Sequence, residues 1–304
     1  MSRKIEGLLT APHTPFHADG SLHPEVIDQQ VANLVEYGIN GVFVTGTTGE
    51  GRLLSFEERK IVAERWAAAG GDDLNIIVHV GTTCQSMTAE LAAHADGLNV
   101  AGVSAMSPIF YRPKTVDDLL AFHRPIAAAA PNKPFYFYDI PSMTHVDLPT
   151  HEYVAKALDT IPNFGGVKFT RTDLYLLQNV RAVSDDFNLL FGADELLMFG
   201  MLGGANGAIG STYNYAAPVY QRVLDALATG DTSLALKEQQ DAVKLVNVLV
   251  QYDVLAAGKA IMAMLGIDCG PTRVPNTQLS VEQKREIYEA LKDLDIFSGT
   301  LTCP

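Results

Sequence analysis

Eight short runs of apolar, β-branched and aromatic residues recur along the chain, and helix-length stretches separate them. Each run is continuously apolar rather than alternating, which is typical of strands buried on both faces of a parallel sheet. We therefore expect eight strands, each followed by a helix. The expected strands span residues 7–11, 41–45, 75–80, 102–106, 135–139, 165–169, 188–191 and 207–209.

The stretches between these runs carry the signals of helices. Two of them begin with a capping-box pattern, in which Ser55 precedes Glu58 and Ser280 precedes Gln283. Three of them show apolar residues at helical spacing, namely Ile27, Val31, Leu34 and Val35, then Ile61, Val62 and Trp66, then Leu119, Leu120 and Ile126.

Eight such strand–helix units predict a closed (β/α)8 TIM barrel. The rival fold is an open, doubly wound α/β sheet, which periodicity alone does not exclude, but the GxGxxG turn that usually follows its first strand is absent. Beyond Asp231 the strand signal stops, and the remaining expected elements are helices over residues 234–250, 256–265 and 280–294. We therefore expect a barrel over residues 1–228 and a C-terminal helical region over residues 229–304.

Charge and cysteine content narrow the functional classes. The chain has 35 acidic and 22 basic residues, which argues against a nucleic-acid partner because phosphate binding needs clustered Lys and Arg. Cys84, Cys269 and Cys303 are isolated and odd in number, which indicates neither a disulfide framework nor a zinc site and fits a reducing cytoplasm. No apolar run has the length of a signal-peptide core at the N-terminus or of a membrane span elsewhere.

The sixth expected strand ends on an unusual lysine, Lys168. Most lysines are solvated surface charges, and this is the ordinary interpretation here too. However, Gly165, Gly166, Val167 and Phe169 give the amine a partly apolar setting, which disfavours its charged form. A neutral amine attacks carbonyl groups, and function in a barrel resides at the C-terminal ends of the strands. Lys168 is therefore a candidate for covalent chemistry.

Other strand ends carry polar groups as well. Residues 46–51 read Gly-Thr-Thr-Gly-Glu-Gly, a turn whose hydroxyl and N–H groups suit a carboxylate or phosphate, although a purely structural turn fits equally. Alternation places Tyr136 and Tyr138 on one side of the fifth strand, either facing the barrel mouth or packing as aromatics. Asp194 and Glu195 follow the seventh strand, where adjacent acids also commonly begin a helix.

Together these strand ends resemble the pyruvate-dependent class I aldolases that include dihydrodipicolinate synthase and N-acetylneuraminate lyase. The resemblance covers the whole chain, and its marks occur in the family's order: Gly46-Thr47-Thr48-Gly49-Glu50, Tyr138-Asp139-Ile140-Pro141, Gly166-Val167-Lys168 and Gly207-Ala208-Ile209-Gly210-Ser211. The sialic acid aldolase branch is the most similar, through Lys168-Phe169-Thr170, Gly192-Ala193-Asp194-Glu195 and Gly210-Ser211-Thr212-Tyr213-Asn214.

The resemblance implies reversible Schiff-base cleavage of N-acetylneuraminate to N-acetylmannosamine and pyruvate. Lys168 would form the imine, and Tyr138 would move the proton. The expected substrate-binding residues are Thr47 and Thr48 on the carboxylate, with Thr170, Gly192, Asp194, Glu195, Gly210 and Ser211 around the sugar chain. No metal or organic cofactor is expected, because the iminium stabilises the developing carbanion and no convincing metal motif is present. Family likeness also implies a homotetramer.

Three positions depart from the family's pattern. Asp139 stands where many relatives have Asn, and Met143 stands where dihydrodipicolinate synthases carry an arginine that binds a second acidic substrate. Phe110 lies in the turn where those synthases place a relay tyrosine. The alternatives are another pyruvate aldolase acting on 2-keto-3-deoxy sugar acids, a dihydrodipicolinate synthase, or a barrel that only binds a ligand.

Overall fold

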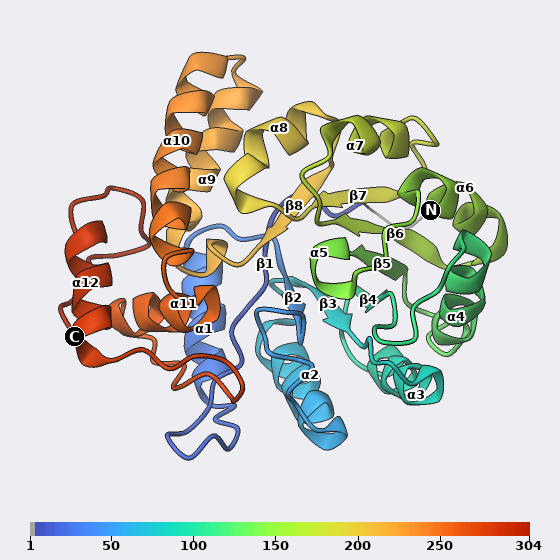
Figure 1. The fold of residues 1–304 in the computed structure, drawn as a ribbon, viewed down its shortest axis with the longest axis horizontal. Coiled ribbons are helices and arrows are strands. Elements are labelled where there is room, and N and C mark those ends of the chain that lie inside the picture. Colours follow the sequence, from blue (N-terminus) through green and yellow to red (C-terminus); the bar gives the residue numbers. More distant parts are fainter. Residues whose placement is uncertain (1–3) are drawn as a thin grey trace.

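The structure, a computed structural model, describes residues 4–304 and contains a closed barrel of parallel strands in the order β1 to β8 (Figure 1). The expected (β/α)8 TIM barrel is thus confirmed, and the open-sheet alternative is wrong. Every expected strand is present, with its ends within one residue of the predicted ones. The strands are β1 Gly7–Thr10, β2 Gly41–Val44, β3 Asn75–His79, β4 Gly102–Met106, β5 Phe135–Asp139, β6 Phe164–Phe169, β7 Asn188–Phe191 and β8 Gly207–Gly210.

Helices follow the strands and cover the outside of the barrel. The capping boxes predicted at Ser55 and Ser280 both form, and Thr115 forms a third with Asp118. The helices are α1 Val26–Glu36, α2 Phe56–Gly70, α3 Gln85–Asp96, α4 Val116–Ala128, α5 Pro141–Thr144, α6 Thr150–Thr160, α7 Leu174–Arg181, η1 Asp194–Leu196, α8 Leu197–Leu202, α9 Tyr213–Ala228, α10 Thr232–Leu249, α11 Val254–Met264 and α12 Val281–Leu291.

Two residues of the apolar helical spacing noted in the sequence are exposed. The side chains of Val35 and Ile61 are each 44% exposed, although both continue an apolar helical spacing. Leu34 and Val62, the adjacent residues, fill the buried positions instead. Adjacent residues of a helix point in directions about 100° apart, so the sequence neighbour of a buried residue can face solvent.

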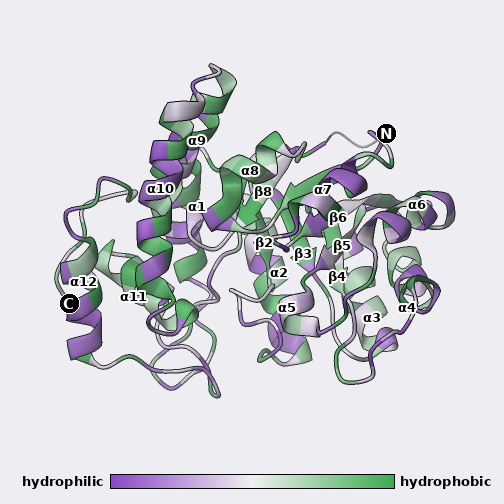
Figure 2. Ribbon diagram, turned by 45° about the horizontal axis from the view of Figure 1, so that its top comes forward, coloured by the Kyte–Doolittle hydropathy of each residue, from purple (hydrophilic) through white to green (hydrophobic). Residues whose placement is uncertain are grey.

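The hydrophobic core has two layers, because alternate residues of a strand point to opposite faces. The inner layer fills the barrel and includes Phe43, Tyr136 and Tyr138. The outer layer packs the strands against the helices and includes Phe135 and Phe137. The predicted alternation on β5 is therefore confirmed, and Tyr138 points into the barrel. Figure 2 shows the hydrophobic residues gathered on the strands and on α11.

The C-terminal helices α10, α11 and α12 lie together on one side of the barrel (Figure 1). Helix α10 packs along α9 and also contacts η1 and α8, which follow β7. The C-terminal region therefore borders the ends of strands β7 and β8. In the described part of the chain no single helix is long and apolar enough to cross a membrane, and α10 and α11 reach that length only as a pair bent by 112°.

Candidate active site

Lys168 is enclosed by aromatic rings near the C-terminal end of β6. Its Nζ lies 4.2 Å from the ring centroid of Phe43 and 4.3 Å from that of Tyr138. Within residues 4–304 its amine makes no hydrogen bond or ion pair, and the residue is 4% exposed. Burial lowers the pKa of Lys168 to about 7, an effect that the charge of Asp194 only partly opposes. About half of the amine is then neutral near pH 7, whereas an ordinary lysine is almost wholly charged.

Tyr138 lies beside Lys168 because the two residues pair in register between β5 and β6. Its hydroxyl shares a hydrogen bond of 3.3 Å with the Thr47 Oγ1. Burial raises the pKa of Tyr138 to about 12, and the Thr47 hydroxyl opposes this shift. The phenol is therefore protonated at neutral pH. Such a phenol can accept a proton only as it passes its own on, and the Thr47 hydroxyl is the hydrogen-bond partner within its reach.

The turn over residues 46–51 brings Thr47 to this position and is held rigidly. Glu50 adopts a left-handed conformation with φ 53°, and a Cβ on Gly51 would lie 1.9 Å from the carbonyl oxygen of Thr45. The buried Glu50 carboxylate contacts the Lys259 Nζ at 3.0 Å and accepts a hydrogen bond from the Arg273 N–H at 2.7 Å. The C-terminal region thus anchors the turn that carries Thr47.

A cavity of about 780 Å³ opens at this end of the barrel. It is lined by five of the eight predicted substrate-binding residues, namely Thr170, Gly192, Asp194, Glu195 and Ser211. Helix α10 adds apolar lining through Val246 and Leu249. Hydroxyls and carboxylates opposite an apolar wall suit a long polyhydroxylated ligand that also carries a methyl group.

The two predicted glycines leave room for neighbouring polar groups. A Cβ on Gly192 would lie 2.1 Å from the Thr170 Oγ1, and one on Gly210 would lie 2.2 Å from the Asp194 Oδ1. The Thr170 hydroxyl is buried and is near enough to Tyr138 to lower the pKa of that phenol, but it makes no hydrogen bond of good geometry among the described residues. A buried hydroxyl without a partner is a site that a ligand can satisfy.

Asp194 is buried and binds the start of α9. Its Oδ2 accepts hydrogen bonds from the Thr212 N–H at 2.9 Å and from the Thr212 Oγ1 at 2.6 Å. Burial raises the pKa of Asp194 to about 6, against the effect of these hydrogen bonds. Asp194 makes no side-chain cap on η1, in which it lies. Its carboxylate instead links the ends of β7 and β8 at the cavity wall.

Thr48 is the one predicted binding residue that contacts neither the cavity nor another residue of the site. It is buried beside Thr47, but it does not line the cavity, and no hydrogen bond of its side chain appears in residues 4–304.

Comparison with known proteins places the chain in a family. The profile of the dihydrodipicolinate synthetase family matches residues 4–294. The chain belongs to this family. It is 40% identical to the N-acetylneuraminate lyase of Homo sapiens over 306 residues, covering 98% of this chain and 95% of that one, and the figures for the Pongo abelii enzyme are the same.

Solved structures of the same family agree with this assignment. The N-acetylneuraminate lyase of Proteus mirabilis superposes with a TM-score of 0.94 at 40% identity, over 97% of this chain and 100% of that one. The N-acetylneuraminate lyase of Aliivibrio salmonicida also gives a TM-score of 0.94 at 40% identity, over 97% of this chain and 98% of that one.

Asp139, which departs from the family's common Asn, has a charged partner here. The Arg171 guanidinium grips its carboxylate with two hydrogen bonds, of 2.6 Å from Nε to Oδ2 and 3.0 Å from Nη2 to Oδ1. Arg171 also bonds the exposed Asp147 at 2.5 Å, and Thr150 donates to Asp139 at 2.6 Å. Burial raises the pKa of Asp139, and the Arg171 hydrogen bond opposes the shift. The pair joins the ends of β5 and β6, the strands that carry Tyr138 and Lys168.

Asp139→Asn should therefore destabilise this protein. The change weakens two charge-assisted bonds to a buried guanidinium, and we expect a loss of about 1–3 kcal/mol in the free energy of unfolding. Asp147→Asn is the matched control, because it removes the exposed partner of the same Arg171 and should cost less than about 1 kcal/mol. Urea denaturation measures both values, and equal losses would contradict the assigned role of the buried pair.

Three contributors to the site were missed in the sequence. Phe43 and His79 occupy inward positions on β2 and β3, and the His79 ring lies 5.4 Å from that of Tyr138. Assigning alternate side chains of the second and third strands to opposite faces, as was done for the fifth strand, would have found both residues. Arg171 had a weaker signal, since a charged residue just after a strand is common.

Proposed function

We propose that this protein is a class I aldolase that reversibly cleaves N-acetylneuraminate to N-acetylmannosamine and pyruvate. The observation that carries the proposal is the Lys168 amine, which is buried between Phe43 and Tyr138 and has a pKa of about 7. The relatives named N-acetylneuraminate lyase support the choice of substrate. The cavity lined by Asp194, whose charge acts on the Lys168 amine, supports the choice as well.

Covalent catalysis begins with neutral Lys168. Its Nζ lone pair attacks the C2 ketone of the open-chain sugar to give a carbinolamine. The carbinolamine hydroxyl takes up one proton and leaves as water, and the nitrogen lone pair forms the protonated imine. Burial favours this step, because the amine is not held in its charged form by a bonded carboxylate. In this proposal Thr47, whose hydroxyl lies beside Tyr138 and whose turn is anchored through Glu50, binds the carboxylate of the substrate.

Cleavage then uses the iminium as the electron sink. The C3–C4 bond breaks, its electron pair forms the enamine, and the iminium nitrogen becomes neutral. Tyr138 accepts the proton of the C4 hydroxyl while passing its own proton to the Thr47 side, so that C4 leaves as the aldehyde of N-acetylmannosamine. Protonation at C3 and addition of water to the resulting imine release pyruvate and restore the amine of Lys168.

The cavity distinguishes this substrate from smaller ones. Pyruvate alone needs only the imine and a carboxylate contact, whereas the sugar chain loses water from several hydroxyls on entry. Asp194, Glu195, Thr170 and Ser211 offer partners for those hydroxyls at the cavity wall. Each hydroxyl left without a partner would cost roughly 1–3 kcal/mol.

Asp194→Ala tests this assignment. We expect kcat/KM for N-acetylneuraminate to fall by roughly five-fold to over a hundred-fold, because a buried acceptor for the sugar is lost. Imine formation with pyruvate should not slow, since removal of the carboxylate lowers the pKa of Lys168 further. Thr212→Val is the matched control, because it removes the hydroxyl that anchors Asp194 but keeps the carboxylate. It should affect thermal stability more than kcat/KM.

An assay panel decides between the candidate substrates. Pyruvate is offered with N-acetylmannosamine, glyceraldehyde or aspartate semialdehyde, and condensation is measured with each. Turnover only with N-acetylmannosamine is expected. Turnover with glyceraldehyde or aspartate semialdehyde would favour a 2-keto-3-deoxy sugar acid aldolase or a dihydrodipicolinate synthase.

If Asp194→Ala changed pyruvate binding and cleavage equally, or changed neither, the sugar-binding role of Asp194 would be wrong.

We also propose a homotetramer acting in the cytoplasm. Family likeness supports the tetramer, as does an exposed aromatic pair, Phe110 and Tyr111, whose side chains are 82% and 85% exposed. Exposed apolar groups of this kind are common at protein–protein interfaces. The isolated cysteines support a reducing compartment. Light scattering of the purified chain gives the number of subunits.

A further inference from the structure

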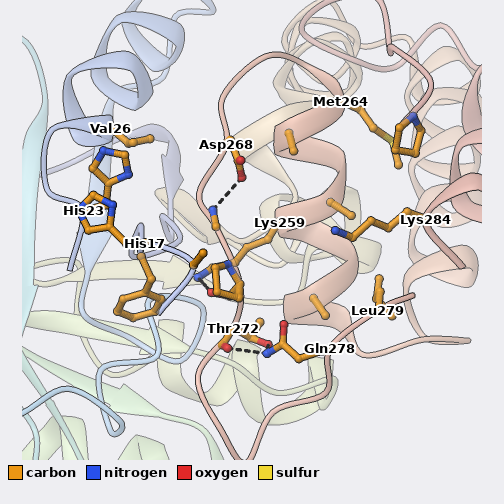
Figure 3. Close-up of a pocket in the computed structure, with 18 of the residues that line it drawn as sticks. His17, His23, Val26, Lys259, Met264, Asp268, Thr272, Gln278, Leu279 and Lys284 are labelled. Carbon is orange, nitrogen blue, oxygen red and sulfur yellow. Dashed lines mark hydrogen bonds between the residues drawn. The ribbon is translucent and has the colours of Figure 1, made fainter. Parts of the chain in front are cut away.

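A short hairpin before α1 brings two histidines together. Phe16 and Leu22 form an antiparallel bridge, and around it the His17 N–H donates to Ser21 O at 2.8 Å and the His23 N–H donates to Pro15 O at 3.0 Å. This backbone arrangement places the imidazoles of His17 and His23 face to face, with ring centroids 4.0 Å apart (Figure 3).

Glu25 completes a cluster of three ligand-type groups. One ring nitrogen of His17, one of His23 and one carboxylate oxygen of Glu25 all lie within 4.8 Å of one another. Across residues 4–304, none of these three side chains has a hydrogen-bond or ion-pair partner. His17 and Glu25 are exposed and His23 is half-buried. Three donor groups without other partners among the described residues therefore lie next to one another at the surface.

We propose that His17, His23 and Glu25 bind a divalent transition-metal ion of the zinc type. Two imidazoles and one carboxylate form a ligand set that zinc uses in proteins, with bonds of about 2.0–2.2 Å and remaining positions open to water. Ligand atoms around such an ion lie about 3.3–3.6 Å apart in tetrahedral geometry. Side-chain rotation on the fixed hairpin closes the remaining gap, and the exposure of the cluster leaves room for it.

The site is separate from the catalytic cavity. The two histidines line a second cavity, of about 710 Å³, between the hairpin, α11 and the chain that precedes α12, and no residue lines both cavities (Figure 3). Next to His17, the Phe16 ring packs 4.3 Å from the Lys259 Nζ. Lys259 in turn pairs with Glu50. The ion would therefore stabilise the hairpin and its packing on α11 without entering the reaction.

Isothermal titration with ZnCl2 tests the proposal on the full chain after EDTA treatment and desalting. We expect one ion per chain and a rise in the melting temperature, because an ion that binds only the folded state stabilises it. His17→Ala and His23→Ala should each weaken binding at least roughly tenfold, since loss of an outer partner of a ligand alone costs about 10–100-fold. Glu25→Gln should weaken it as well.

His94→Ala is the control variant, since His94 and Glu64 form a surface pair of 2.7 Å that no third ligand-type group joins in the described residues. Zinc binding should be unchanged in it. Binding that is undiminished in the His17→Ala/His23→Ala double variant, or no binding at millimolar ZnCl2, would overturn the site. Turnover should survive EDTA, and its loss with recovery on adding zinc would overturn the separation from catalysis.

Discussion

Lys168→Met should abolish cleavage of N-acetylneuraminate while leaving the barrel folded. The nucleophile is lost, and we expect kcat/KM to fall by roughly four orders of magnitude or more, as for other covalent nucleophiles. Stability should be retained or improved, because a buried amine without a bonded anion is replaced by an apolar side chain of similar length. Steady-state kinetics and thermal melting measure the two effects.

Lys259→Met is the matched control, because Lys259 is the second buried lysine and has the opposite environment. It bonds Glu50 and also donates to Thr14 O at 2.9 Å and Pro271 O at 2.8 Å. Its removal leaves the Glu50 carboxylate without its cation and should cost about 3–5 kcal/mol. If Lys168→Met destabilised the protein as much as Lys259→Met, or kept turnover, the covalent role of Lys168 would be wrong.

Tyr138→Phe should lower turnover by about a hundred-fold or more, because the hydroxyl that moves the C4 proton is removed. The ring beside Lys168 is kept, so the fold and the apolar setting of the amine should be retained. Cleavage kinetics measure the loss.

Tyr136→Phe serves as the comparison for this change. Tyr136 points into the same barrel two residues earlier, but its hydroxyl donates to the Asn188 Oδ1 at 3.5 Å instead of contacting Thr47. The turnover of the Tyr136→Phe variant should be nearly normal. The reverse result, with Tyr138→Phe active and Tyr136→Phe inactive, would move the proton-transfer role to Tyr136.

The barrel and its reactive centre could be predicted from local patterns. Continuous apolar runs indicate strands buried on both faces. The C-terminal ends of parallel strands lie together at one end of a barrel. These two rules bring the ends of the fifth and sixth strands together, and the structure pairs Tyr138 with Lys168 there. The family resemblance then supplied the roles that spacing alone does not give, and the cavity lining of Asp194 and Glu195 agrees with them.

What could not be predicted depends on contacts between distant residues. Glu50 accepts a hydrogen bond from Arg273, which is 223 residues away, so the anchoring of the Thr47 turn had no local signal. Asp139 appeared only as a departure from the family's pattern, because its partner Arg171 lies 32 residues on, in a different loop. Asp194 was expected to bind substrate or to begin a helix. It does begin η1, but its bonds to Thr212 at the start of α9 are a further arrangement that spacing does not show.

Reductive trapping with pyruvate tests the central claim most directly. The protein is incubated with pyruvate and cyanoborohydride over a range of pH, and the adduct is located by peptide mass spectrometry. We expect one reduced adduct, on the peptide that contains Lys168, whose rate of formation rises through pH about 7 as the amine loses its proton. An unmodified Lys168 in fully active protein, or an adduct on another lysine, would contradict the account.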